Sequence, residues 1–152
     1  MRRLLTAAAV AAAIFVPSSV AAIAPAGIAS AASGVTCSSL KGTITSTVTI
    51  SKCTPSGGKG YKTATAPATS LAGGGNLTWS KSGATTTVGN TKVTTVTPNK
   101  CGKSTEYSFT GTVTAASTSG VGIPAVGDTV SALACVSGSG KITLLKGTTI
   151  QL

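Results

Sequence analysis

The sequence contains no histidine and very few acidic residues, and these two shortages exclude most catalytic chemistry. Of its 152 residues, only Glu106 and Asp128 are acidic. Without histidine, neither Ser-His-Asp nor Cys-His catalysis is available, because both use the imidazole as the general base. No C-x-x-C pair is present to hold zinc, and two carboxylates are too few for calcium. We therefore expect a protein that is not an enzyme and that needs no metal or cofactor.

Arginine is equally scarce, while lysine is abundant. Both arginines lie in the first three residues, and aromatic residues make up 3% of the chain. Nucleic-acid recognition normally uses arginine forks and stacked aromatic rings, so we expect no nucleic-acid partner. Ten lysines against two carboxylates leave a net charge of +8 after residue 31. This charge suits an anionic cell-wall polymer as partner, although lysines also provide solubility and protect sheet edges from aggregation.

Residues 1–31 have the organisation of a signal peptide. A positive start, Met1-Arg2-Arg3, precedes an apolar run from Leu4 to Val16, and Ala29-Ser30-Ala31 offers small residues for cleavage. The apolar run is shorter than the ~20 residues that a membrane span requires. We expect cleavage near Ala31 and a single secreted β domain over 32–152, without a membrane span, outside the cell or associated with its wall.

The four cysteines predict two disulfides, because an even number of cysteines in an exported chain normally pairs. Sequence alone allows three connectivities. We favour Cys37–Cys53 with Cys101–Cys135, since nearer partners lose less entropy on closing a loop. The first bridge requires a bend or a reversal of the chain between Gly42 and Lys52, because a straight strand over this range would hold its ends more than about 30 Å apart.

Alternation of apolar and hydroxyl side chains predicts an all-β protein. In 42–51, Ile44, Val48 and Ile50 alternate with threonines, which indicates a strand with one buried face. The same alternation predicts a strand over 107–115, where Gly111 suggests a bulge or a close backbone approach. Together with the further strands that we expect, this favours an antiparallel β-sandwich or a partly closed barrel of about eight strands. The further strands are 76–80, 84–88, 91–97, 129–136 and 141–145. We expect a turn at Gly89-Asn90 between 84–88 and 91–97, and a kink at Gly147 before the end of the chain.

Three parts of the chain resemble those of small Thr/Gly-rich secreted proteins of actinobacteria: 37–43 (CSSLKGT), 104–107 (STEY) with 111–114 (GTVT), and 134–136 (ACV). The resemblance covers the chain after the leader. It implies export and a β domain with two disulfides, and it supplies no functional site.

Three functional hypotheses remain open. The first is a non-enzymatic secreted or envelope protein that acts by surface contact. The second is a small ligand carrier or inhibitor that uses two Gly-rich loops, 54–75 and 116–128, because long loops often carry function. The third is a carbohydrate-binding module or a hydrolase, in which Tyr61 and Trp79 stack on a sugar or Glu106 and Asp128 act as an acid pair. Against the third, Trp79 suits the core and both acids suit solvated surface positions.

Overall fold

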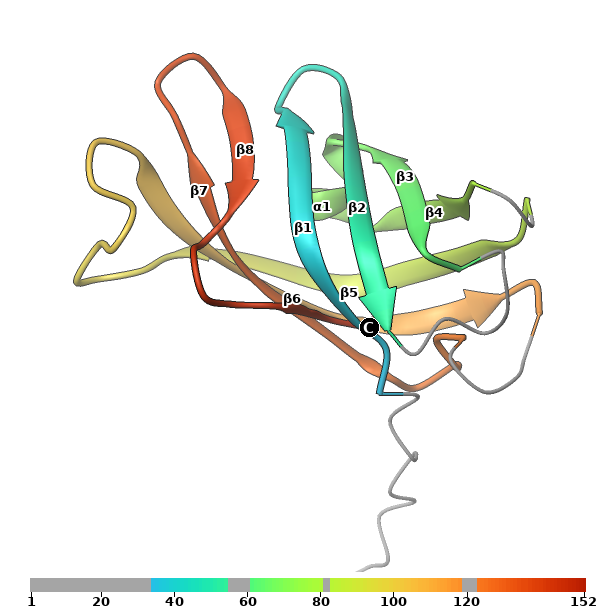
Figure 1. Ribbon diagram of the computed structural model, residues 1–152. Helices are drawn as coiled ribbons and strands as arrows, with labels where there is room; N and C mark the ends of the chain where they lie inside the picture. The colour runs from blue at the N-terminus through green and yellow to red at the C-terminus, as the bar shows by residue number, and fades with distance from the viewer. Residues whose placement is uncertain (1–33, 55–60, 81–82, 119–122) are drawn as a thin grey trace, which may run out of the picture.

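The computed structural model describes residues 34–54, 61–80, 83–118 and 123–152, and the expected leader lies outside this part. The described residues form nine strands and one short helix (Figure 1). In chain order these are β1 (Thr36–Thr43), β2 (Thr47–Thr54), β3 (Thr63–Pro67), α1 (Thr69–Gly73), β4 (Gly75–Trp79), β5 (Thr85–Thr95), β6 (Thr105–Ala116), β7 (Thr129–Val136), β8 (Lys141–Leu144) and β9 (Ile150–Gln151).

The strands form a closed antiparallel barrel. Each strand from β1 to β7 pairs with the next one along the chain, and β8 pairs back with β1. The prediction of an all-β antiparallel fold of about eight strands is confirmed, and of the two architectures expected, the structure has the barrel. Closure removes the exposed sheet edges that would otherwise pair with another chain.

Strands β8 and β9 together occupy one position in the barrel wall. Both run antiparallel to β1, with Gly42 opposite Ile142 and Cys37 opposite Ile150. The segment between them leaves the wall as a turn, in which the Thr148 amide donates to the Leu145 carbonyl. Gly147 has a φ of 82° there, a conformation that favours glycine. The kink expected at Gly147 is therefore confirmed.

The single strand predicted over 42–51 is wrong, because the chain reverses at its beginning. A turn between β1 and β2 is closed by the Ser46 amide, which donates to the Thr43 carbonyl. Ile44 lies in this turn and is 54% exposed, contrary to the alternation that placed it inside. The reversal places Cys37 directly opposite Cys53, and both predicted disulfides, Cys37–Cys53 and Cys101–Cys135, are formed.

The turn predicted at Gly89-Asn90 is a β-bulge inside one long strand. Residues 84–88 and 91–97 were expected to be separate strands, but β5 runs through and keeps β6 as its partner. Gly89 pairs with Thr112 and Lys92 with Thr110, so two residues of β5 stand opposite Gly111 alone. A Cβ at Gly111 would lie 3.1 Å from the Gly89 carbonyl oxygen, which confirms the close backbone approach expected there.

The prediction that 54–75 is a plain loop is wrong. It contains β3 and α1, a helix of five residues. The sequence signal was weak because 63–67 (TATAP) alternates threonine with alanine, whose small side chain looks like a loop residue. Ala64 and Ala66 are nevertheless buried in the barrel.

Because consecutive strands are antiparallel, the chain connections alternate between the two ends of the barrel. At one end lie the β1–β2 turn, α1, the β5–β6 connection and the β7–β8 turn; we call this end the mouth (Figure 1). At the other end lie the β2–β3, β4–β5 and β6–β7 connections; we call it the base. The two ends are filled differently, and this difference defines the candidate site.

Gly42→Ala should destabilise the barrel by about 2 kcal/mol, because the new methyl group has no room. A Cβ at Gly42 would lie 2.6 Å from the Thr47 carbonyl oxygen and 2.7 Å from the Val48 Cα, both backbone atoms. Gly138→Ala is the matched control, because a Cβ there meets nothing within 4 Å. The measurement is urea unfolding with the disulfides intact. Equal free energies of unfolding for the two variants would contradict the packing described here.

Candidate functional site

Aromatic side chains fill the base of the barrel. Trp79 is fully buried, and its Nε1–H donates to Thr86 Oγ1 at 3.0 Å. Its ring centroid lies 5.3 Å from that of Tyr61, which is also buried. The Tyr61 and Thr118 hydroxyl oxygens are 2.6 Å apart. Neither ring of the predicted sugar-binding pair presents a face to solvent, so the two rings belong to the core.

The mouth, in contrast, is hollow. A pocket of about 380 Å³ opens there. Its volume lies within the roughly 300–1,000 Å³ typical of small-molecule sites. We call it the mouth pocket. It is lined by Ile44, Ala68, Thr69, Leu71, Ala72, Val93, Tyr107, Phe109, Val136 and Ile142.

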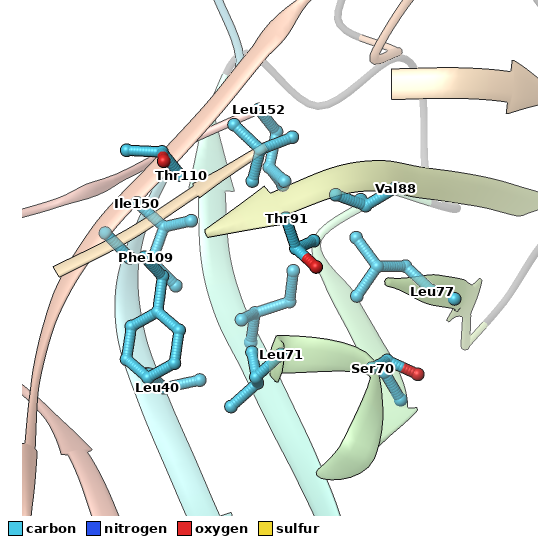
Figure 2. A pocket seen from close by; sticks show the side chains of 15 residues that line it. Leu40, Ser70, Leu71, Leu77, Val88, Thr91, Phe109, Thr110, Ile150 and Leu152 are labelled. Carbon is cyan, nitrogen blue, oxygen red and sulfur yellow. The ribbon is translucent and has the colours of Figure 1, made fainter. Parts of the chain in front are cut away.

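A smaller hollow of about 60 Å³ lies inside the barrel, and we call it the lumen pocket (Figure 2). Apolar side chains from opposite walls point into it, among them Leu40 on β1, Leu77 on β4 and Ile150 on β9. Thr91, at the β5 bulge, also lines it. An interior of eight strands is wide enough either to be filled by side chains or to hold one small ligand. This barrel is filled at its base and hollow above it.

Two side chains line both pockets. Leu71 comes from α1 and Phe109 from β6, and each is only partly buried. Along β6, Tyr107 and Phe109 lie on the same face, because alternate residues of a strand point the same way. Tyr107 lines only the mouth pocket, so Phe109 lies one step deeper. The two pockets therefore adjoin at Leu71 and Phe109.

Helix α1 forms one wall of the mouth and is held by backbone groups. Thr91 Oγ1 donates to the Ala72 carbonyl at 2.8 Å, which ties α1 to the β5 bulge. The Ala68 amide donates to the Ser46 carbonyl at 2.8 Å, which ties the start of the helix to the β1–β2 turn. With five residues the helix is too short to be stable alone, so these two contacts fix the position of Leu71.

The lining of the two pockets determines what they can bind. None of their lining residues is acidic or basic, and the only ionisable group is the Tyr107 phenol. Such a surface offers no nucleophile paired with a base and no charge to hold a phosphate or a carboxylate. It gains free energy by removing apolar surface from water, at about 25 cal/mol per Å². The geometry therefore favours binding of an apolar molecule.

The two acidic residues do not form a catalytic pair. Glu106 is the second residue of β6, near the mouth, whereas Asp128 precedes β7 at the base, where its carbonyl accepts from the Val113 amide. Val113 lies seven positions after Glu106 on this strand, which is roughly 20 Å at ~3.3 Å per residue. The acid pairs of glycosidases are about 5 to 10 Å apart.

Both carboxylates are buried, and the prediction that they are solvated is wrong. Glu106 is 1% and Asp128 2% exposed. Glu106 Oε2 accepts from the Lys100 amide at 2.6 Å, and Asp128 Oδ2 accepts from the Ala125 amide at 2.8 Å. Each carboxylate thus satisfies the backbone of a neighbouring connection, which is why it is buried despite its charge.

Within the described ranges, no group of three or more His, Cys, Asp or Glu side chains lies close enough to hold a metal ion. In the same part of the chain, no helix is long and apolar enough to cross a membrane.

The two loops that we predicted as a joint site do not line the pockets together. Of the first, 54–75, the part from Ala66 to Gly75 lines the pockets. Of the second, 116–128, the described residues line neither pocket, because the β6–β7 connection is at the base. Sequence analysis missed the site residues Val93, Tyr107 and Phe109 of the wall. Their inward alternation was visible, but alternation alone does not distinguish a core residue from a pocket residue.

Comparisons of this chain with models of protein families, with curated proteins and with solved structures find no match. The candidate site is therefore defined by its geometry alone.

Glu106→Ala should cost about 1 to 3 kcal/mol, because it leaves the Lys100 amide without its buried acceptor. In the same variant, amide hydrogen exchange at Lys100 should become faster. Glu106→Gln is the matched variant and should cost less, since the amide oxygen of glutamine still accepts a hydrogen bond. Urea unfolding and hydrogen exchange measure both effects. If alanine and glutamine behave alike and like the wild type, Glu106 does not hold this connection.

Proposed function

We propose that this protein is a non-enzymatic secreted protein that binds a small apolar molecule in the mouth pocket and carries or sequesters it. The observation that carries the proposal is the apolar pocket of about 380 Å³ at one end of a closed barrel. Its lining comes from elements far apart in the sequence, from Ile44 in the β1–β2 turn to Ile142 on β8. A pocket assembled on a closed wall is preformed, so little ordering entropy opposes binding.

Two features of the chain support the extracellular part of this proposal. Residues 1–31 are organised as an export signal. Two disulfides join Cys37 with Cys53 and Cys101 with Cys135, as expected of a protein in an oxidising compartment. Disulfides of this kind stabilise a domain mainly by constraining its unfolded chain, which suits a protein that persists outside the cell.

The proposal predicts saturable binding of an uncharged apolar fluorophore such as N-phenyl-1-naphthylamine. Val136→Ser should weaken binding about tenfold, because contact with a valine side chain is worth roughly 1.4 kcal/mol. Val136 is only partly buried and lines the mouth pocket. The measurement is fluorescence titration of the purified, disulfide-bonded protein.

Leu133→Ser is the matched control on the same strand. Leu133 is partly buried but lines neither pocket, and its position on β7 alternates with that of Val136. It should leave the affinity unchanged. Equal weakening by both variants, or no saturable binding to the wild type, would refute a ligand site at the mouth.

A second candidate function, contact with an anionic polymer of the cell envelope, is favoured by the distribution of charge. All eight lysines in the described ranges are exposed, whereas Glu106 and Asp128 are buried. The surface is therefore more uniformly positive than the net charge indicates. Lys41 stands opposite Thr143 and Lys141 opposite Thr43, so these two lysines are diagonal neighbours on the outside of the barrel.

This second function predicts retention on isolated, phosphate-rich cell wall at low salt and release at high salt, since salt screens exposed charges. Replacing Lys41 and Lys141 together by glutamate should lower retention several-fold, whereas replacing both by arginine should preserve it. Wall stripped of its phosphodiester polymer is the control. Salt-independent retention, or equal retention on stripped wall, would argue against an electrostatic contact.

A further inference from the structure

We infer that the ligand is a single unbranched hydrocarbon chain that enters between Leu71 and Phe109 and ends in the lumen pocket. This inference rests on the proposed function and specifies its ligand. It arises from the arrangement of two adjoining hollows of very different size, about 380 Å³ at the mouth and about 60 Å³ in the lumen.

The lumen pocket suits a narrow apolar group. Its volume exceeds the ~10–15 Å³ that one water needs, but its lining offers few polar partners, and apolar cavities stay dry. Such a cavity favours a few methylene groups over water. Fused or branched ring systems are wider than a methylene chain and exceed a hollow of this size. The lumen therefore selects for a narrow chain end.

Two side chains form the boundary between the pockets. Leu71 and Phe109 line both hollows, so a molecule that occupies both must pass these two side chains. Both are partly buried rather than locked in the core. Ala132 stands opposite Phe109 in the register of β6 and β7 and also lines the lumen. A small residue at this position leaves space beneath the phenyl ring.

The lining of both pockets is uncharged, which restricts the chemistry of the ligand. No acidic or basic side chain lines either hollow, so the part of the ligand inside them is uncharged. A polar end group of the ligand would remain at the mouth, where Thr69 and Tyr107 provide hydroxyl groups along the lining. The chemistry expected is that of an alkyl or acyl chain with its polar end at the opening.

The test uses primary alcohols, which carry no charge and therefore do not engage the lysines. Binding to the purified, disulfide-bonded protein is measured by calorimetry along the series from 1-hexanol to 1-dodecanol. Affinity should rise about fourfold for each methylene group that is buried, until the lumen is full. 2-Ethyl-1-hexanol has the same composition as 1-octanol and should bind about tenfold more weakly, because its branch cannot pass between Leu71 and Phe109.

Filling the lumen separates this inference from the proposed function. Ala132→Leu places three more carbon atoms in the lumen pocket, so the gain in affinity should stop about two or three methylene groups earlier. Ala66→Val fills the same hollow from β3 and is the second variant, in case the first does not fold. Buried Trp79 reports folding through its emission. Val136→Ser, at the mouth, should instead weaken all chain lengths by the same factor.

Each outcome decides one of the claims. Equal affinities for 1-octanol and 2-ethyl-1-hexanol, or a chain-length profile that neither filling variant changes, would overturn the chain inference while leaving a ligand site at the mouth. Failure of every alcohol and of the fluorophore to bind would overturn both claims. A dimer in sedimentation that Val136→Ser dissociates, without alcohol uptake, would also overturn both, because the mouth would then hold a second copy of the chain.

Discussion

When β1 pairs with β8, the meander becomes a closed wall whose inward side chains have a fixed space to fill. The register of this contact, Gly42 opposite Ile142, places a glycine and an apolar side chain at the seam. Close approach of β2 to Gly42 leaves no room for a side chain there. Closure also makes the number of strands, rather than any single residue, determine the width of the interior. Whether that interior is solid or hollow then depends on the size of the side chains that each strand supplies.

The base of the barrel holds two aromatic side chains in contact, whereas the lumen is lined mainly by aliphatic ones, two of which are alanines. Trp79 and Tyr61 pack against each other at the base. Above them β3 contributes Ala66 and β7 contributes Ala132, which are too small to meet across the barrel. Only four aromatic residues follow residue 31, so placing two of them at the base leaves Tyr107 and Phe109 for the other end. Scarcity of aromatic side chains is therefore a physical reason why one end of this barrel is open.

Sequence analysis predicted the all-β class, the pairing of the cysteines and four of the strands (β4, β6, β7 and β8), because alternation and loop closure depend on local spacing. It failed where local signals have two physical meanings. Gly89-Asn90 suits a turn or a bulge, and only the shared partner β6 distinguishes them. Ile44 continues an alternating pattern, but it lies in the turn that the Cys37–Cys53 bridge requires. Such local signals could not predict the candidate site. An inward-facing valine produces the same sequence pattern whether it packs against another side chain or lines a pocket.

The burial of Glu106 and Asp128 connects the interior of the molecule with its surface. Each carboxylate is used to satisfy a backbone amide of a connection, at the mouth for Lys100 and at the base for Ala125. Negative charge is thereby removed from the surface and is not placed in the pockets. What remains is an outer wall whose described charges are lysines and an interior whose lining is uncharged. An amphiphile with an apolar chain would thus meet two separate environments, and only the outer one responds to salt. The separation follows from where the backbone needs acceptors, so the same two residues that stabilise the connections also determine the charge that a partner encounters.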